Sequence, residues 1–120
     1  CPEGWRVPTK EDYDDLMNKG VGTGYLYAGG ELKATGHEFW NEPNTYATNL
    51  SGFNALASGT RSLGYVGTFL NKGYNAIFWT STPHDEVPAY FITLSYNSGE
   101  VGSGSHYKNY GHSVRCICEK

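Results

Sequence analysis

The fold is decided by the first sixteen residues of the chain, CPEGWRVPTKEDYDDL (residues 1–16). Larger apolar residues alternate with smaller or polar ones as far as Val7, which is the period of a half-buried strand. Thr9 is a suitable helix N-cap, and Asp12 can reach back to it as in a capping box. A glycine at position 20 ends the helix. The stretch therefore predicts a short strand that leads into an amphipathic helix. Its apolar stripe consists of Tyr13, Leu16 and Met17.

The composition is that of a small domain rich in loops. The chain has 120 residues, of which 38% are hydrophobic and 15% aromatic, so the core depends on a few large rings. The 16 glycines and 5 prolines favour turns over long helices. A net charge of -3 gives no electrostatic footprint for nucleic acid, and no apolar run reaches the length of a membrane span. We therefore expect one domain over residues 1–120 that neither binds nucleic acid nor spans a membrane.

Three cysteines lie near the two ends of the chain, at positions 1, 116 and 118. Their spacing fits no zinc motif, so no metal site is expected from them. In a small, glycine-rich domain of this kind, a disulfide that joins the ends is the better interpretation. Cys116 and Cys118 are two residues apart on a predicted strand, about 6.5–7 Å, which is too far for them to pair with each other. One of them is expected to pair with Cys1, and Cys116 is favoured. Two alternatives are three thiols in a cytosolic protein and Cys1 as the acylated cysteine of a lipoprotein.

The middle of the chain predicts mainly loops. Residues 25–27 form a short strand or a scrap of helix, and the glycines at 29–30 turn the chain. Residues 31–35 alternate like an edge strand. A long irregular region follows over 36–60, and a second loop covers 62–75. Loops of this length in compact domains usually have a function of their own.

The last third of the chain predicts an antiparallel sheet. Strands at 76–82 and 89–96 are joined by an exposed loop, and a turn at 97–100 leads into a hairpin strand at 101–105. Residues 110–118 alternate again and end the domain. With one helix early, loops in the middle and strands late, the sequence predicts an α+β domain whose two ends meet. The residues expected in the core are Trp5, Phe78, Trp79, Phe91 and Leu94.

Several blocks of sequence occur in an order that is typical of one family. They are CPxGWxVPT (1–9) before an acidic helix, GxLKATG (30–36), WNxPNxxATNxSGFxAL (40–56), FWTST (78–82) and GxSVRC (111–116). Together they cover almost the whole chain and resemble the Fibrobacter succinogenes major paralogous domain family. The resemblance implies a C-type-lectin-like α+β fold, related to that of the formylglycine-generating enzymes, and a disulfide between Cys1 and Cys116. It also implies the C-terminal module of a longer exported protein, a lipoprotein or fimbrial-type protein of Bacteroidetes or Fibrobacteres.

The sequence contains no motif that predicts catalysis. A nucleophile elbow, a metalloprotease helix, a phosphate loop and a dinucleotide fingerprint are all missing. The formylglycine-generating enzymes rely on a pair of reactive cysteines, whereas a pairing of Cys116 with Cys1 leaves only Cys118 here. The adjacent acids at 14–15 and 85–86 are expected to be solvated. We therefore expect a domain that is not an enzyme.

The loop at 36–49 contains most of the candidate ligand-binding residues. Flat rings stack on sugar faces, while amide and carboxylate oxygens bind hydroxyl groups or calcium. The alternative is that the tryptophan plugs the core and the asparagines bond backbone turns. Glu42-Pro43-Asn44 has the letters of the calcium-binding triplet of mannose-type lectins, but it lies in an earlier block and is interpreted as a coincidence. The candidate residues are Trp40, Glu42, Asn44, Tyr46 and Asn49 from this loop, with Tyr107 from a second, tyrosine-rich surface that includes Tyr96, His106 and Tyr110.

These residues predict a binding role at the cell surface. The first hypothesis is a non-catalytic adhesion module whose ligand is a glycan, with calcium as the one cofactor that the oxygen-rich loop admits. The second is a structural or assembly module of a surface appendage or lipoprotein, whose partner is a protein. An exposed Trp40 and Tyr46 would favour the first hypothesis, and a flat apolar edge strand or a reactive Cys118 would favour the second.

Overall fold

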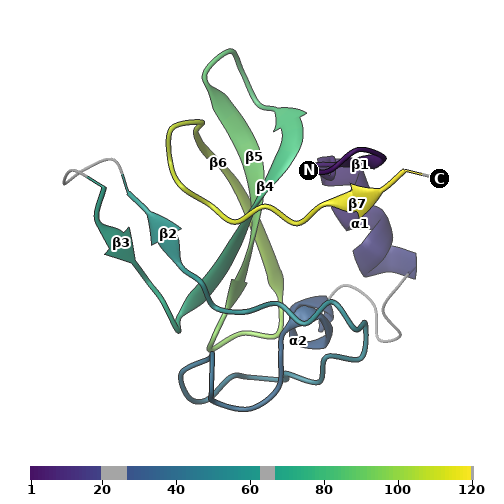
Figure 1. Ribbon diagram of the computed structural model, residues 1–120. Helices are drawn as coiled ribbons and strands as arrows, with labels where there is room; N and C mark the ends of the chain where they lie inside the picture. The colour runs from purple at the N-terminus through teal and green to yellow at the C-terminus, as the bar shows by residue number, and fades with distance from the viewer. Residues whose placement is uncertain (20–26, 63–66, 120) are drawn as a thin grey trace.

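The computed structural model describes residues 1–19, 27–62 and 67–119 (Figure 1). Within them, strands form three antiparallel sheets, in the orders β1-β7, β2-β3 and β4-β5-β6. The elements are β1 (Trp5–Arg6), α1 (Lys10–Lys19), α2 (Ala28–Leu32), β2 (Thr60–Arg61), β3 (Phe69–Leu70), β4 (Asn75–Pro83), β5 (Pro88–Ser95), β6 (Val101–Tyr107) and β7 (Ile117–Cys118). The arrangement is a small α+β fold with mainly antiparallel sheet.

The predicted helix and its cap are confirmed in α1. The Thr9 amide donates to Oδ2 of Asp12 over 2.7 Å, and the Asp12 amide donates to Oγ1 of Thr9 over 3.1 Å. This is the reciprocal pair of a capping box, with aspartate in the place that glutamate usually holds. Arg6 of β1 donates two hydrogen bonds to the same carboxylate, at 2.5 and 3.0 Å, and holds its pKa well below the usual range. The carboxylate of Asp12 therefore ties the strand to the helix. The predicted stop at Gly20 lies outside the described residues.

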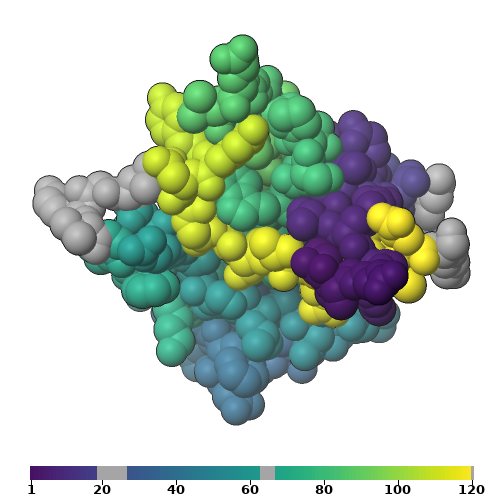
Figure 2. Space-filling view, turned by 45° about the horizontal axis from the view of Figure 1, so that its top comes forward, coloured from purple at the N-terminus to yellow at the C-terminus, as the bar shows by residue number. Residues whose placement is uncertain are grey.

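The two ends of the domain are joined as predicted. Trp5 lies opposite Cys118 in the β1-β7 ladder, and Cys1 forms a disulfide with Cys116 across a Cα–Cα distance of 5.8 Å. Figure 2 shows the N-terminal and C-terminal segments in contact on one side of the molecule. Cys118 is a free, exposed thiol.

The central sheet divides its side chains between two faces. One face, which includes Phe78 and Leu94, packs into a core with α1 and the loop at 36–59. On the other face, Trp79 lies opposite Phe91, and the segment at 110–116 passes over them (Figure 1). The buried members of the core are Tyr13, Leu32, Ala34, Trp40, Ala55, Ala57, Ala76, Phe78, Ile92 and Leu94.

The predicted core is therefore correct in part. Phe78 and Leu94 are buried, but Trp79 and Phe91 are only half-buried, because a thin segment rather than a helix covers their face. Trp5 was expected inside and is 46% exposed. Among the described residues, its strand pairs with β7 alone, at the surface, so Trp5 lines an open groove instead of the core.

The prediction of an edge strand over residues 31–35 is wrong. The chain instead forms the short helix α2, which contains the two glycines predicted to turn it. A Cβ on Gly29 would lie 2.3 Å from the Glu100 carbonyl oxygen, and one on Gly30 would lie 2.2 Å from that of Tyr46. These glycines therefore allow two backbone segments to approach the helix closely. Only Lys33 keeps a β-type contact, an isolated parallel bridge to Ala55.

Two further expectations need correction. The loop expected over 62–75 contains β3, which pairs with β2, and its last residue begins β4. The strand expected over 110–118 is reduced to β7, because the residues before it pair elsewhere: Gly111 bridges Arg61, and Ser113 bridges Phe78 at the edge of β4. The hairpin of β5 and β6 is as predicted, and so is the irregular region expected over 36–60, except that Thr60 already belongs to β2. Among the described residues, no helix has the length and apolar character needed to cross a membrane.

Candidate functional site

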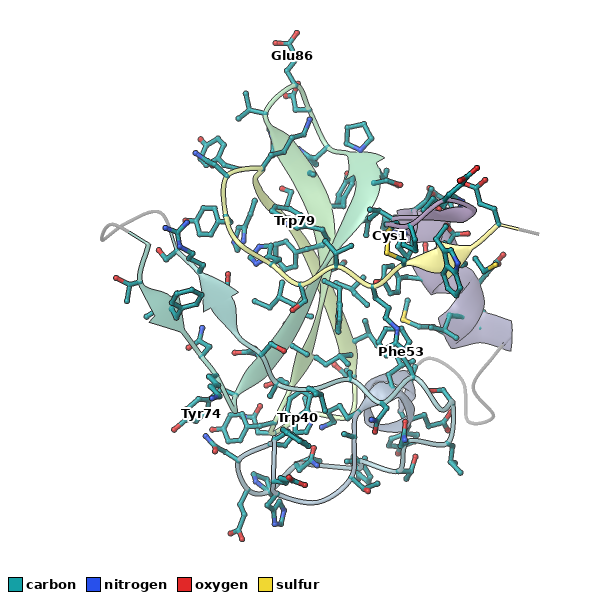
Figure 3. The ribbon with its side chains drawn as sticks, viewed as in Figure 1. Cys1, Trp40, Phe53, Tyr74, Trp79 and Glu86 are labelled. Atoms are coloured by element: carbon teal, nitrogen blue, oxygen red, sulfur yellow. A yellow bond between two sulfur atoms is a disulfide. The ribbon has the colours of Figure 1, made fainter. Side chains whose placement is uncertain are left out.

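Trp40, the most prominent candidate of the middle loop, belongs to the core. Its side chain is 1% exposed, and its indole nitrogen donates to the Ala55 carbonyl over 2.9 Å. Figure 3 shows it between the end of the central sheet and the loop below it. No face of the ring is open to a sugar, so Trp40 acts as a core plug in this structure.

The two candidate asparagines of the loop are also used structurally. Asn44 is 6% exposed, and its Nδ2 donates to the carbonyl oxygens of Ala34 and Gly36 over 3.1 and 2.8 Å. Asn49 accepts from the Asn54 amide over 2.8 Å and donates to its side chain over 3.2 Å. Both asparagines hold backbone turns, which is the alternative role that the sequence left open.

Glu42 lies apart from these residues, at the surface. Its side chain is 82% exposed, and Oε1 lies 3.6 Å from Nδ1 of His37. The segment Glu42-Pro43-Asn44 therefore does not present a carboxylate and an amide together to solvent, because the side chain of Asn44 is buried. Among the described residues, no three histidine, cysteine or acidic side chains are grouped so that they could hold a metal ion.

A buried lysine that the sequence did not single out holds the loop in place. Lys33 is 0% exposed, and its Nζ donates to the carbonyls of Thr45, Ser95 and Ser98 over 2.8, 2.9 and 3.0 Å. Burial lowers the pKa of Lys33 to about 8, so at pH 7 it is still an ammonium group with three hydrogens for three acceptors. The Trp40 ring lies 5.3 Å away and adds a cation–π contact. This lysine therefore ties the middle loop to the turn between β5 and β6.

Tyr46 is the aromatic candidate of this loop that stays open to solvent. Its side chain is 62% exposed, and its ring meets that of Tyr27 edge to face at 4.9 Å. A shallow pocket of about 280 Å³ opens beside the two rings. Its remaining walls come from Thr45 and from the β5–β6 turn, namely Asn97, Ser98, Gly99 and Glu100.

The backbone of Tyr46 is held in an uncommon conformation. Its φ is 59°, in the left-handed region that bulky residues rarely adopt. The neighbouring Thr45 is fixed on both sides, because its amide donates to the Tyr96 carbonyl over 2.9 Å and its carbonyl accepts from Lys33. A Cβ on Gly99 would lie 2.8 Å from Cδ2 of Tyr46, so glycine is needed where the ring is seated. Strain of this kind tends to occur where a side chain must be presented in one orientation.

Tyr107 lies at the opposite end of β6, beside a second pocket. It is 58% exposed, and the pocket of about 320 Å³ is lined by rings from two segments. The lining residues are His84, Pro88, Ser105, His106, Tyr107 and Tyr110. Tyr46 and Tyr107 therefore belong to two separate surfaces, one at each end of the central sheet.

A chain of hydrogen bonds runs under the second pocket. The Thr60 hydroxyl donates to the Gly111 carbonyl over 3.2 Å and lies 2.8 Å from Nδ1 of His112, whose Nε2 lies 2.9 Å from Nδ1 of His106. This pattern assigns the protons: Nδ1–H of His112 donates to Thr60, and Nδ1–H of His106 donates to His112. His106 also stacks on Tyr110 with ring centroids 4.6 Å apart. Because its Nε2 accepts a hydrogen bond, His112 is neutral in this arrangement.

The histidine pair makes stability depend on pH. Burial, and secondarily the nearby His106, lowers the pKa of His112 to about 4, and burial also lowers that of His106. In the unfolded chain His112 is protonated as the pH falls below about 6.5, whereas in the folded protein it is protonated only near pH 4. The free energy of unfolding should therefore be highest above pH 6.5 and should decrease as the pH falls from 6.5 to about 4. Because His112 is only half-buried, we expect a loss of about 1–2 kcal/mol.

Urea unfolding at a series of pH values between 7.5 and 4.5 tests this expectation. His112→Gln should be less stable at pH 7.5 and should lose less stability than the parent on acidification. An identical pH dependence in parent and variant would contradict the assignment to His112.

A comparison with protein-family models decides the family. The model of the Fibrobacter succinogenes major domain matches residues 1–118. The chain belongs to this family. In this Fibrobacter major domain, the matched residues include both cysteines of the disulfide and both pockets. No curated protein and no solved structure matches the chain.

The pocket beside Tyr46 in this Fibrobacter major domain was only partly predictable. The sequence pointed to Tyr46, but Asn97 and Glu100 were interpreted only as a hairpin turn, and Tyr27 as part of a short strand or helical scrap. Contacts between residues far apart in the chain bring these groups together, for example the bond from the Gly30 amide to the Gly99 carbonyl over 3.1 Å. No spacing pattern in the sequence carries that information.

Proposed function

We propose that this domain is a non-catalytic binding or adhesion module of the cell surface and that it binds a glycan in the pocket beside Tyr46. The observation that carries the proposal is the rigid presentation of the Tyr46 ring next to polar side chains. Tyr27 meets the ring edge to face, and Asn97 and Glu100 lie on the same pocket wall. An aromatic face with amide and carboxylate groups around it suits a ligand that has both C–H and hydroxyl surfaces.

The strained backbone supports the same function. A ring that is already fixed loses little conformational freedom on binding, so more of the contact energy is available for affinity. Tyr46 is held through the hydrogen bonds of Thr45, and Gly30 and Gly99 leave the space that Tyr46 occupies. A structural role alone would not require the ring to be 62% exposed.

The location and the fold relationship are part of the proposal. The disulfide between Cys1 and Cys116 favours an oxidising compartment, as expected for an exported lipoprotein or fimbrial-type protein. An antiparallel sheet, a long loop region and joined termini are also what the resemblance to C-type-lectin-like domains implies. We propose that relationship on these features and on membership of the family.

The first test is a glycan array probed with the oxidised domain, in calcium and again with chelator. We expect binding to a defined set of glycans, and a loss of at least about tenfold in affinity in Tyr46→Ala, because the stacking surface is removed. Glu100→Gln should weaken the same glycans. Tyr107→Ala is the matched control, since it removes an exposed tyrosine at the other end of the sheet.

The outcomes separate the two surfaces and the role of calcium. Loss of binding in Tyr107→Ala but not in Tyr46→Ala would move the site to the histidine-rich pocket. Loss with chelator would make calcium part of the site. An array without signal in both conditions would rule out simple glycan recognition.

The second candidate function is that of an assembly module whose partner is a protein. The specific observation is the β2-β3 hairpin, which projects from one side of the molecule (Figure 1). On it Phe69 is 78% exposed and Leu70 is 44% exposed, and Tyr74, which follows, is 46% exposed. Exposed apolar side chains on a short sheet suit a protein contact better than a sugar.

A further inference from the structure

A second ligand site is suggested by a groove that shares no lining residue with the Tyr46 pocket. It has a volume of about 300 Å³ and lies between α1 and the β1-β7 ribbon. Its walls are mainly apolar and include Trp5, Leu16, Phe53 and Ile117. Figure 3 shows Phe53 between β7 and α2, on the same side of the molecule as Cys1. The groove is large enough for a ring system of one or two rings.

One residue of the lining, Tyr13, carries a buried hydroxyl group. Tyr13 is 2% exposed, and its hydroxyl has no hydrogen-bond partner among the described residues. Burial raises the pKa of Tyr13, against a smaller opposite effect of the nearby Arg115, so the phenol stays protonated and can act as a donor. A buried donor without an acceptor costs free energy, and a bound acceptor would recover it.

Arg115 supplies the charge of the groove. Its guanidinium group lies 4.6 Å from the centroid of the Phe53 ring, and no carboxylate pairs with it in the described part of the chain. Asp12 also lines the groove, but its two oxygens already accept hydrogen bonds from Arg6 and Thr9. The charge that remains available to a ligand is therefore positive.

We infer that this groove binds a small apolar carboxylate. The apolar body of the ligand packs against Trp5, Leu16 and Ile117, and its carboxylate accepts a hydrogen bond from Tyr13 and faces the guanidinium of Arg115. Charge complementarity selects an acid over a neutral molecule of the same shape. This site is independent of the proposed glycan site, since it uses none of the same residues.

The test uses indole-3-acetate and its neutral isostere indole-3-acetamide as probes in an NMR titration of the folded, oxidised domain. We expect indole-3-acetate to shift the signals of Leu16, Ile117 and the Trp5 indole, with a dissociation constant of about 1 mM for a probe of this size. The amide should bind about tenfold more weakly, because it lacks the charge that Arg115 would pair with.

Two variants assign the polar groups. Tyr13→Phe should weaken indole-3-acetate about tenfold without lowering the midpoint of urea unfolding, because it removes only a hydroxyl that has no partner. Arg115→Gln should weaken the acid about tenfold and leave the amide unchanged. Arg61→Gln, an exposed arginine on β2, should change neither.

Equal affinity for acid and amide would overturn the inference, because the groove would then be a simple apolar surface. Unchanged binding of the acid in both Tyr13→Phe and Arg115→Gln would overturn it as well. So would groove signals that depend on protein concentration without any probe, since a second copy of the chain would then be the occupant.

Discussion

Replacing both Cys1 and Cys116 by serine is expected to lower the free energy of unfolding by about 4–5 kcal/mol. The disulfide closes a loop across a sequence separation of 115, and it removes more disorder from the unfolded chain than any short loop would. Domains of this size are stable by about 5–15 kcal/mol, so the loss is a large fraction of the total. The two cysteines are replaced together because Cys1, if it were left alone, could pair with the exposed Cys118.

Guanidinium unfolding of the oxidised parent and of the double variant measures the difference. Cys118→Ser is the matched control: it also removes a sulfur near the C-terminus, but it leaves the bridge intact and should unfold at the same denaturant concentration as the parent. If the double variant were as stable as the control, the disulfide would not stabilise the fold by restricting the unfolded chain.

Lys33→Met is expected to lower the free energy of unfolding by about 3–5 kcal/mol. Methionine fills nearly the same volume but leaves the carbonyls of Thr45, Ser95 and Ser98 without the donor that the ammonium group supplies. A buried ion pair can be exchanged for apolar groups at little cost when both partners are replaced. Here the acceptors belong to the backbone and cannot be removed, so the penalty for unpaired buried groups remains.

Denaturant unfolding and amide hydrogen exchange test this expectation together. Lys72→Met is the matched control, because Lys72 is exposed and the change in side chain is the same. The amide of Thr45 should exchange faster in Lys33→Met, since the loop loses its attachment to the β5–β6 turn. Unchanged stability and exchange would mean that the three carbonyls find other donors. Weaker glycan binding in this variant is a further expectation, because Thr45 positions Tyr46.

The elements that could be predicted from the sequence are those fixed by local interactions. Thr9 and Asp12 are three residues apart, so the cap and the start of α1 follow from neighbouring residues. Strand β4 could be recognised from its strong apolar centre at residues 76–79, and β5 from its run of apolar, aromatic and β-branched residues between two loops. By contrast, Gly29 and Gly30 favour a turn when only their neighbours in sequence are considered, but they lie in α2, where the missing Cβ leaves room for the backbone of Glu100 and Tyr46.

Predicting which residues form the candidate site required knowing which side chains are buried, and residue type alone does not determine burial. Trp40 and Tyr46 lie in one loop and have similar chemistry, but one is 1% exposed and the other 62%. The difference arises because Trp40 contacts Ala55 and Lys33 in the core. No motif in the sequence marks either residue as a partner of Trp40. Lys33 itself alternates with apolar residues as an edge-strand lysine does, so the sequence gives no sign that it is buried.

The covalent link between the ends of the domain also has a mechanical consequence. A pulling force applied to the two ends enters at Cys1 and leaves at Cys116, whose Cα atoms are 5.8 Å apart. The tension then passes through a single sulfur–sulfur bond, and the residues between the two cysteines carry no load. A domain of this kind inserted in a tether neither lengthens nor unravels under tension, so its surface pockets keep their shape while the chain around it is stretched.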